Sequence, residues 1–201
     1  MFDNVINTYQ NKYNEVKERL FPNNRIVLVG GCLRDTFYGV EVKDLDFVIE
    51  VPALEAMPFS PWDRQHQIVF GEVFNGQQAH YIKIDNLWAY LNQDNGIIDV
   101  VESSNKDVNF IFIRDIPSYT KQFPDSISKM VFDGETIHVS RDWMQGHENN
   151  SVYYRADIKE DRLDKLQRKY PNKEFIIDGP GNFNRQAVLD LPELAEVQRP
   201  A

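Results

Sequence analysis

The sequence predicts a mixed α/β (α+β) fold in which helices flank a mixed β-sheet. Three observations support this prediction. Apolar runs such as RIVLVGG (residues 25–31) and DLDFVIEV (44–51) have the length of strands. An amphipathic helix pattern opens the chain, and the dipeptides NG and DG, which favour turns, separate further apolar runs. With 42% hydrophobic and 12% aromatic residues among 201, the chain can bury one large core.

In the first half of the chain, apolar residues recur at three- and four-residue steps and then give way to shorter, strand-like runs. Glycines mark a turn after the first strand and the end of the short helix that follows it. The expected elements are, in order, a helix over 3–20, a buried strand over 25–31, a turn at Gly30 and Gly31, a short helix over 32–39, and a strand over 44–51.

The second half of the chain predicts strands first and a charged helix later. The expected elements are strands over 67–74 and 79–84 joined as a hairpin by NGQQ, a helix over 86–93, strands over 96–103 and 107–114, a DG hairpin within 126–140, a charged helix over 157–170 and a strand within 171–184. We expect residues 1–115 to form a catalytic core. Residues 116–201 would form a C-terminal extension packed on it, consisting of the hairpin, the charged helix and a loosely attached tail.

Composition narrows the classes of function. The formal net charge is −9, which argues against loose, charge-driven binding to nucleic acid but allows a local basic pocket or a bound metal ion. The single cysteine, Cys32, excludes an internal disulfide and a multi-cysteine zinc site. The dispersed histidines also argue against zinc. Because the N-terminus is polar and no apolar run spans a bilayer, we expect a cytoplasmic protein without a membrane partner.

Two carboxylates, Asp44 and Asp46, stand two residues apart at the start of the second predicted strand. Side chains at this spacing point to the same face, so their charges repel unless water or a divalent cation lies between them. Mg²⁺ favours one or two carboxylates together with phosphate oxygens of a substrate. A purely structural interpretation is that the two acids lie at an exposed strand end. The neighbouring glycine turn, whose backbone N–H groups could hold phosphate, favours nucleotide chemistry instead.

The whole segment 27–50, VLVGGCLRDTFYGVEVKDLDFVIE, resembles the polymerase-beta-like nucleotidyltransferase superfamily. It is most similar to the head domains of bacterial poly(A) polymerases and tRNA CCA-adding enzymes, which carry a Gly-Gly, then an Arg-Asp, then an Asp-x-Asp signature. The matching residues here are Gly30, Gly31, Arg34, Asp35, Gly39, Lys43, Asp44 and Asp46.

The resemblance implies a nucleotidyltransferase that moves an NMP from an NTP to an acceptor hydroxyl by a two-metal mechanism. Asp44 and Asp46 would hold Mg²⁺ or Mn²⁺, and the two glycines would let the backbone approach the triphosphate. Arg34 would contact phosphate with Asp35 as its partner. The resemblance favours ATP as the NTP and an RNA 3′ end as the acceptor, with a protein or a small molecule as alternatives.

The sequence departs from the pattern of the superfamily in two places. A third carboxylate is expected on a neighbouring strand, but VNFIFI carries Asn109 there. Asp99 is the first candidate to complete the site, and Asp107 and Asp125 are further candidates. The CCA-adding class also carries an Arg-Arg-Asp motif after the catalytic strands, and of this motif the present sequence keeps only Asp125. These departures leave a second interpretation open, a weak or inactive nucleotidyltransferase-fold binding module such as an antitoxin or a regulatory subunit.

Cations gather between residues 155 and 169 of this otherwise acidic chain. A purely structural interpretation is that these cations lie on a solvated helix face and form ion pairs with acids four residues away. The functional interpretation is a surface that binds the triphosphate or an acceptor phosphate, with Arg155 as the residue to test first. The cations in question are Arg155, Arg162, Lys165, Arg168 and Lys169.

Overall fold

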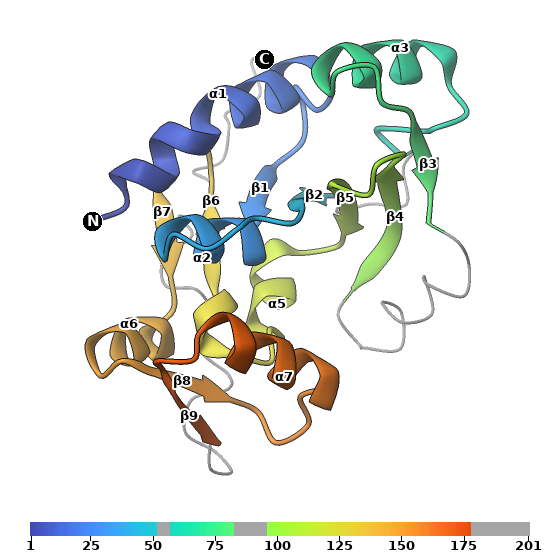
Figure 1. Cartoon of the computed structure of the whole chain (residues 1–201). Coiled ribbons are helices and arrows are strands. Elements are labelled where there is room, and N and C mark those ends of the chain that lie inside the picture. Colours follow the sequence, from blue (N-terminus) through green and yellow to red (C-terminus); the bar gives the residue numbers. More distant parts are fainter. Residues whose placement is uncertain (52–56, 83–95, 178–201) are drawn as a thin grey trace, which may run out of the picture.

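The computed structural model describes residues 1–51, 57–82 and 96–177. These residues form a seven-stranded mixed sheet with strand order β3-β4-β5-β2-β1-β6-β7 and a second sheet of β8 and β9 (Figure 1). The strands are β1 (Ile26–Val29), β2 (Leu45–Glu50), β3 (Ala79–Tyr81), β4 (Ile97–Ser103), β5 (Val108–Ile113), β6 (Met130–Phe132), β7 (Ile137–Val139), β8 (Ser151–Tyr154) and β9 (Glu174–Ile177). The helices are α1 (Asp3–Arg19), α2 (Gly31–Phe37), α3 (Arg64–Val73), α5 (Ile116–Lys121), α6 (Arg141–Glu148) and α7 (Glu160–Lys169), with a 3-10 turn, η1, at Ser126–Ser128. The predicted mixed α/β fold is confirmed.

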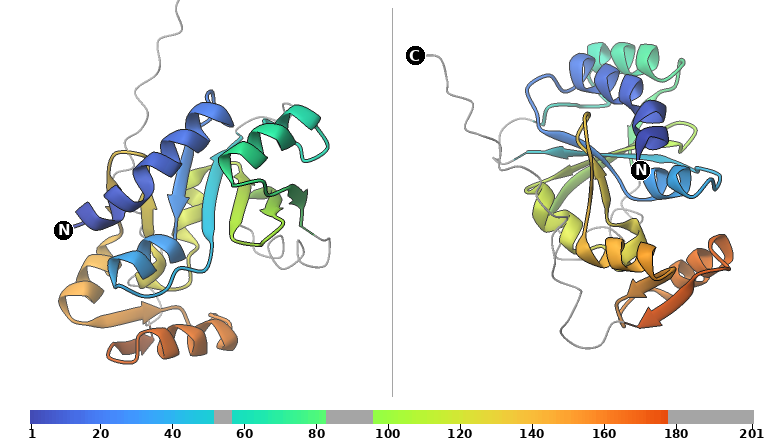
Figure 2. Two further views of the ribbon diagram at one scale, coloured as in Figure 1. Left: turned by 45° about the horizontal axis from the view of Figure 1, so that its top comes forward. Right: turned by 90° about the vertical axis from the view of Figure 1, so that its left-hand side faces the viewer.

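Helices cover both faces of the large sheet. Helices α1 and α3 lie on one face and α5 lies on the other (Figure 2). On the first face, Val16 and Phe70 belong to the same core cluster as Phe47. On the second face, Ile116 belongs to a cluster with Val48. Neighbouring residues of a strand point to opposite sides, so β2 contributes to both cores.

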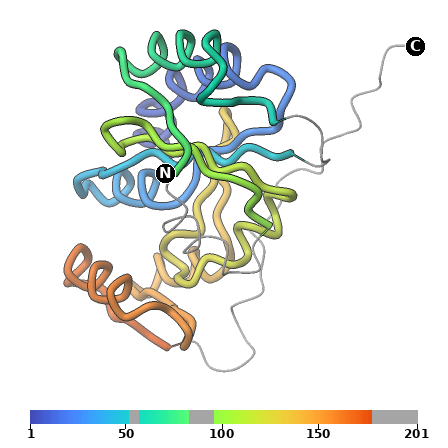
Figure 3. Tube along the Cα trace, turned by 90° about the vertical axis from the view of Figure 1, so that its right-hand side faces the viewer, coloured from blue at the N-terminus to red at the C-terminus, as the bar shows by residue number. Residues whose placement is uncertain are grey.

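A smaller unit, made of α7, β8 and β9, lies beyond the sheet on the side of α5 (Figure 3). Its own core contains Ile127, Val152, Leu166 and Tyr170. The β6–β7 hairpin belongs to the large sheet, where β6 pairs antiparallel with β1. The predicted domain boundary at residue 115 stays a prediction.

One expected hairpin is wrong. Residues 67–74 lie in or next to α3 rather than in a strand, and β3 pairs with β4. Asp63 begins α3 by accepting the backbone N–H of His66 at 3.0 Å. Phe70 and Val73, three residues apart, are its buried residues. A short apolar run does not distinguish a buried helix turn from a strand, and here the N-cap and the core behind it decide for the helix.

Two helices, α5 and α6, arise where no helix was predicted. Each has an N-cap side chain: Asp115 accepts the N–H of Ser118 at 2.7 Å, and Ser140 accepts the N–H of Trp143 at 3.3 Å. The structure confirms the other strands predicted within the first 140 residues, among them β3, which is described as Ala79–Tyr81. It also confirms the charged helix, as α7, and the last predicted strand, as β9. The predicted helix over 86–93 and the tail over 189–201 lie outside the described residues.

A buried ion pair joins the segment before β6 to α6. The ammonium of Lys129 lies 2.6 Å from Asp142, and the two side chains are 1% and 3% exposed. Replacing Lys129 with methionine leaves the carboxylate buried without its cation, so we expect a loss of about 3–5 kcal/mol in the free energy of unfolding. Urea denaturation would measure this loss. Methionine in place of the exposed Lys121 is the matched control, and an equal effect in both variants would contradict the prediction.

Candidate active site

A glycine turn links β1 to α2 beside the start of β2. Gly30 has φ +71°, a conformation that side-chain-bearing residues rarely adopt, and its N–H donates to the carbonyl of Met130 at 3.1 Å. Because β1 and β2 run antiparallel with Val29 opposite Asp46, the turn after β1 lies next to the first residues of β2. The strand pairing therefore places the predicted glycine turn beside the predicted acid pair.

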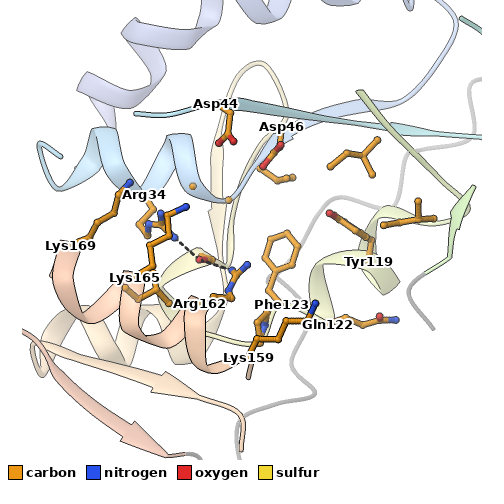
Figure 4. Close-up of a pocket in the computed structure, with 18 residues that line it drawn as sticks. Arg34, Asp44, Asp46, Tyr119, Gln122, Phe123, Lys159, Arg162, Lys165 and Lys169 are labelled. Carbon is orange, nitrogen blue, oxygen red and sulfur yellow. Dashed lines mark hydrogen bonds between the residues drawn. The ribbon is translucent and has the colours of Figure 1, made fainter. Parts of the chain in front are cut away.

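Asp44 and Asp46 both point into one cavity (Figure 4). The side-chain amide of Asn109, opposite Asp46 on β5, donates to Oδ1 of Asp46 at 2.9 Å. Burial, reinforced by the nearby charge of Asp44, raises the pKa of the Asp46 carboxyl to about 6 in spite of this hydrogen bond. The exposed Lys43 ammonium lies 3.8 Å from Asp44 and offers little compensation. A cation bound between the carboxylates of Asp44 and Asp46 would relieve the repulsion between their charges.

The opposite wall of this cavity of about 490 Å³ is formed by one face of α7. Its lining residues from this segment are spaced by three or four along the helix, which places them on the same side. They are Lys159, Arg162, Lys165, Leu166 and Lys169. Figure 4 shows the cationic side chains below the acid pair, with Arg34 of α2 beside them. The cavity thus has two carboxylates on one wall and several cations on the other.

A buried network ties α2 to the end of α7. Asp35 accepts hydrogen bonds from Nε of Arg34 at 2.6 Å, from the hydroxyl of Tyr170 and from the ammonium of Lys169. Burial alone would raise the pKa of Asp35, but the bond from Arg34 together with its charge outweighs burial and lowers it. Arg34 also donates to the hydroxyl of Ser128 at 2.8 Å. The network sets the position of the cations that face the acid pair.

Asp125 makes a second link between the core and α7. Its carboxylate caps η1 by accepting the N–H of Ser128 at 3.0 Å and accepts Nε of Arg162 at 2.9 Å. Burial would raise the pKa of Asp125, but the charge of Arg162 and the Ser128 hydrogen bond bring it below its ordinary value. Asp125 therefore orients Arg162 at the edge of the cavity.

The end of α5 supplies an aromatic part of the lining. Tyr119, Gln122 and Phe123 all line the cavity. The rings of Tyr119 and Phe123 meet edge to face, with centroids 5.4 Å apart and planes at 84°. No helix or strand was predicted over residues 116–124, although an Asp followed two residues later by Pro, here Asp115 and Pro117, is a signal for a helix start.

The structure brings some of the predicted site residues together and separates others. Around the cavity lie Gly30, Gly31, Arg34, Asp44 and Asp46, with Asp35 and Asp125 directly behind it. Lys43 lines a second cavity of about 360 Å³ that also touches Asp44. Arg155 forms an ion pair with Asp157 and does not line the first cavity. The i, i+3, i+7 spacing of Arg162, Lys165 and Lys169 would have identified the cations that share one helix face and line the cavity.

The candidates for a third acid lie apart from the pair. Asp99 pairs with Phe112, three positions from Asn109, so strand alternation places it on the face opposite Asp46. Asp107 accepts the Ser103 hydroxyl at 2.7 Å and lines the second cavity.

On the face of Asp46, the register instead places Glu102 opposite Asn109. The carboxylate of Glu102 accepts from or pairs with His80 at 3.1 Å. Glu102 was not among the site residues predicted from the sequence. The signal that could have identified it is strand alternation: once β4 and β5 are aligned, the β4 residue opposite Asn109 must share the face of Asp46.

Cys32 and Trp143 are buried in the core and do not line the cavity. Cys32 is 1% exposed, and burial raises the pKa of its thiol. Trp143 is buried, whereas Trp62 is 86% exposed beside Tyr81; Trp88 lies outside the described residues. Within the described ranges, no group of three or more His, Cys, Asp or Glu side chains could hold a metal ion. In the same ranges, none of the helices combines the length and apolar character needed to cross a bilayer.

Comparison with solved structures found similar chains. A CCA-adding enzyme from Thermotoga maritima complexed with tRNA matches 90% of this chain and 40% of its own, at 13% identity and a TM-score of 0.51. A CCA-adding enzyme with CTP matches 89% and 41%, at 13% identity and a TM-score of 0.48. A tRNA-processing enzyme in its apo form matches 76% and 37%, at 16% identity and a TM-score of 0.46.

The first of these likenesses shows the fold: the chain has a nucleotidyltransferase-like fold, as the resemblance predicted. The chain spans about two fifths of the length of the solved structures it matches. Protein-family models and curated proteins gave no match to the sequence.

Proposed function

We propose that the protein is a nucleotidyltransferase that moves an NMP from an NTP, with ATP favoured, to an acceptor hydroxyl and releases pyrophosphate. One observation carries the proposal: Asp44 and Asp46 share a cavity with the cationic face of α7 and with Arg34. A nucleotide–metal complex needs both, carboxylates for the ion and cations for the remaining charge of the triphosphate.

The acid pair fits a resident Mg²⁺ or Mn²⁺. Two carboxylates supplemented by phosphate oxygens are the oxygen ligands that Mg²⁺ takes in nucleotide sites. The raised pKa of the partly buried Asp46 means that its ionised form lacks a compensating charge, which is what a bound cation supplies. When bound, metal ions would stabilise the negative charge that develops on the attacking and leaving oxygens of the two-metal reaction.

The chain's own side chains would bind and orient the substrate. Arg34, Arg162, Lys165 and Lys169 would hold the phosphates, and Asn109 would hold the Asp46 carboxylate in one orientation through its amide. In the transfer, the acceptor oxygen bonds to the α-phosphorus while the bond from that phosphorus to the bridging oxygen of pyrophosphate breaks. The acceptor proton leaves to water or to a carboxylate, because the amide of Asn109 cannot accept it.

The candidate base for this proton is Glu102, which shares the face of Asp46, whereas Asp99, which the sequence suggested, lies on the opposite face of the sheet. For the acceptor itself, an RNA 3′ end is the first choice, because the T. maritima structure with this fold is a CCA-adding enzyme complexed with tRNA. A protein or a small molecule is the alternative.

A transfer assay tests the proposal. The protein is incubated with Mg²⁺, each NTP labelled at the α-phosphate, total RNA and cell extract. Label on RNA or on protein would establish transfer and identify the class of acceptor. Absence of label with every NTP, together with a melting temperature that NTP and Mg²⁺ do not change, would overturn it, because a ligand of the native state must raise the melting temperature.

The cationic face of α7 gives a matched pair of variants. We expect Lys165→Ala to weaken NTP binding about tenfold, because it removes a charge from the cavity wall. Arg168→Ala removes a cation from the same helix outside the cavity lining and should leave binding unchanged. Calorimetric titration with ATP and Mg²⁺ measures both. Equal weakening would mean that α7 acts only through the overall charge.

A second candidate function is a catalytically weak or inactive binding module, such as an antitoxin or a regulatory subunit. Asn109 favours it, because an amide stands opposite Asp46 where the resembling superfamily carries an acid. In that case NTP and Mg²⁺ would still raise the melting temperature, but no label would be transferred to any acceptor.

A further inference from the structure

The two ends of the cavity differ in chemistry. Most of the cations, Arg34, Lys165 and Lys169, lie at one end, and the other end carries the aromatic rings of Tyr119 and Phe123, with Lys159 beside them. Figure 4 shows these groups on opposite sides, with the acid pair above and between them. A nucleoside triphosphate has the same asymmetry, since its charge is concentrated at one end and its aromatic base forms the other.

The aromatic end is preformed by the fold. The ring of Tyr119 packs edge to face against Phe123, and both pack on the core cluster between α5 and the sheet. The N-cap Asp115 fixes the start of α5. At the end of α5, the N–H of Phe123 donates to the carbonyl of Thr120 at 3.3 Å. The N–H of Arg155 donates to the carbonyl of the next residue, Pro124, at 2.9 Å. A ring held in this way can stack a base at little entropic cost.

We propose that the base of the bound NTP stacks on Phe123, supported by Tyr119, while its triphosphate lies toward Arg34 and Lys169. This inference rests on the proposed function and adds to it the orientation of the nucleotide and the residues that select the base. Stacking tolerates every base, because each has a π face. The adjoining side-chain amide of Gln122 carries both donors and an acceptor, the set that distinguishes base edges by hydrogen bonding.

A purely structural role for Phe123 makes a different prediction. If its ring only covered the core under α5, its removal would lower stability without distinguishing one ligand from another. Stacking, in contrast, requires that the loss fall on ligands that contain a base. Inorganic triphosphate, which carries the phosphates alone, separates the two roles.

The test compares ATP, CTP and inorganic triphosphate, each with Mg²⁺, by calorimetric titration of the full chain. For the unaltered protein we expect tighter binding of the NTPs than of triphosphate. Phe123→Leu keeps an apolar side chain but removes the π face. It should weaken NTP binding about tenfold and leave triphosphate binding unchanged. Phe123→Trp should retain NTP binding. Melting without ligand verifies that each variant is folded.

A second variant addresses base selection. Gln122→Met removes the amide donors and acceptor at a similar size and without adding a charge, so we expect the ratio of ATP to CTP affinity to change by about threefold or more with triphosphate binding unchanged. An unchanged ratio would overturn the role of Gln122.

The outcomes separate the inference from the function on which it rests. NTP binding that is indifferent to Phe123→Leu, or an equal loss for NTP and triphosphate, would overturn the stacking proposal and leave the proposed function standing. Failure of the unaltered protein to bind either ligand would overturn both.

Discussion

Asp46→Asn is expected to abolish nucleotide transfer, by about a thousandfold or more, while making the metal-free protein more stable. Transfer is lost because an amide is a poor ligand for Mg²⁺ and the charge that holds the ion is gone. Stability rises because the carboxylate of Asp46 is ionised at neutral pH at a position that disfavours its charge. The new amide keeps an oxygen that can accept from Asn109.

The gain in stability should depend on pH in a defined direction. The folded-state pKa of about 6 lies above the ordinary value near 4. The protonated carboxyl is therefore tolerated at low pH, and native stability is lost as the pH rises from about 4 through 6. Allowing for the partial exposure of the side chain, we expect Asp46→Asn to stabilise the metal-free protein by about 1 kcal/mol at pH 8 and to have no effect at pH 4.

Urea denaturation in the presence of a chelator at the two pH values measures this difference, and the labelled-NTP assay measures transfer. Glu102→Gln tests the candidate base on the face of Asp46, and Asp99→Asn, on the opposite face, is its matched carboxylate control. Loss of transfer in Glu102→Gln but not in Asp99→Asn would identify the third acid, and no loss in either would mean that the acceptor proton leaves to water. Full transfer by Asp46→Asn would contradict the assigned role of the acid pair.

Asp35→Asn is expected to destabilise the protein by about 3–5 kcal/mol. The substitution leaves the 8% exposed guanidinium of Arg34 without its buried counter-charge, and Lys169 also loses its partner. Because both cations line the cavity, NTP binding should weaken as well. Urea denaturation and calorimetric titration measure the two effects.

Tyr170→Phe is the control for the same network, because it removes two hydrogen bonds, one donated to Asp35 and one accepted from Nε of Arg34 at 3.0 Å, and no charge. We expect a loss of about 1–2 kcal/mol. The pKa of Asp35 is held below its ordinary value, so its contribution to stability is present at neutral pH and disappears as the pH falls below about 4. The unaltered protein and Asp35→Asn should converge in stability there. A constant gap at every pH would argue against an ion-pair origin.

The strongest sequence predictions were those in which local chemistry and the pattern of side chains agree. The glycine turn, the two strands around it and the acid pair follow from residues 27–50 alone, because only a glycine adopts the backbone at Gly30 easily and strand alternation alone aligns Asp44 with Asp46. The error at residues 67–74 arose where periodicity is ambiguous and the N-cap of Asp63 decided the outcome.

The sequence by itself therefore determined the mixed α/β fold, the turn and the acid pair, since each depends on contacts between neighbours in the chain. Only the tertiary structure decided what faces that pair. Phe123 and Lys165 stand far from Asp46 in sequence, and strand register alone separates Glu102 from Asp99. Such placements depend on how α5 and α7 dock onto the sheet, through buried partners such as Asp35, and no local pattern encodes docking.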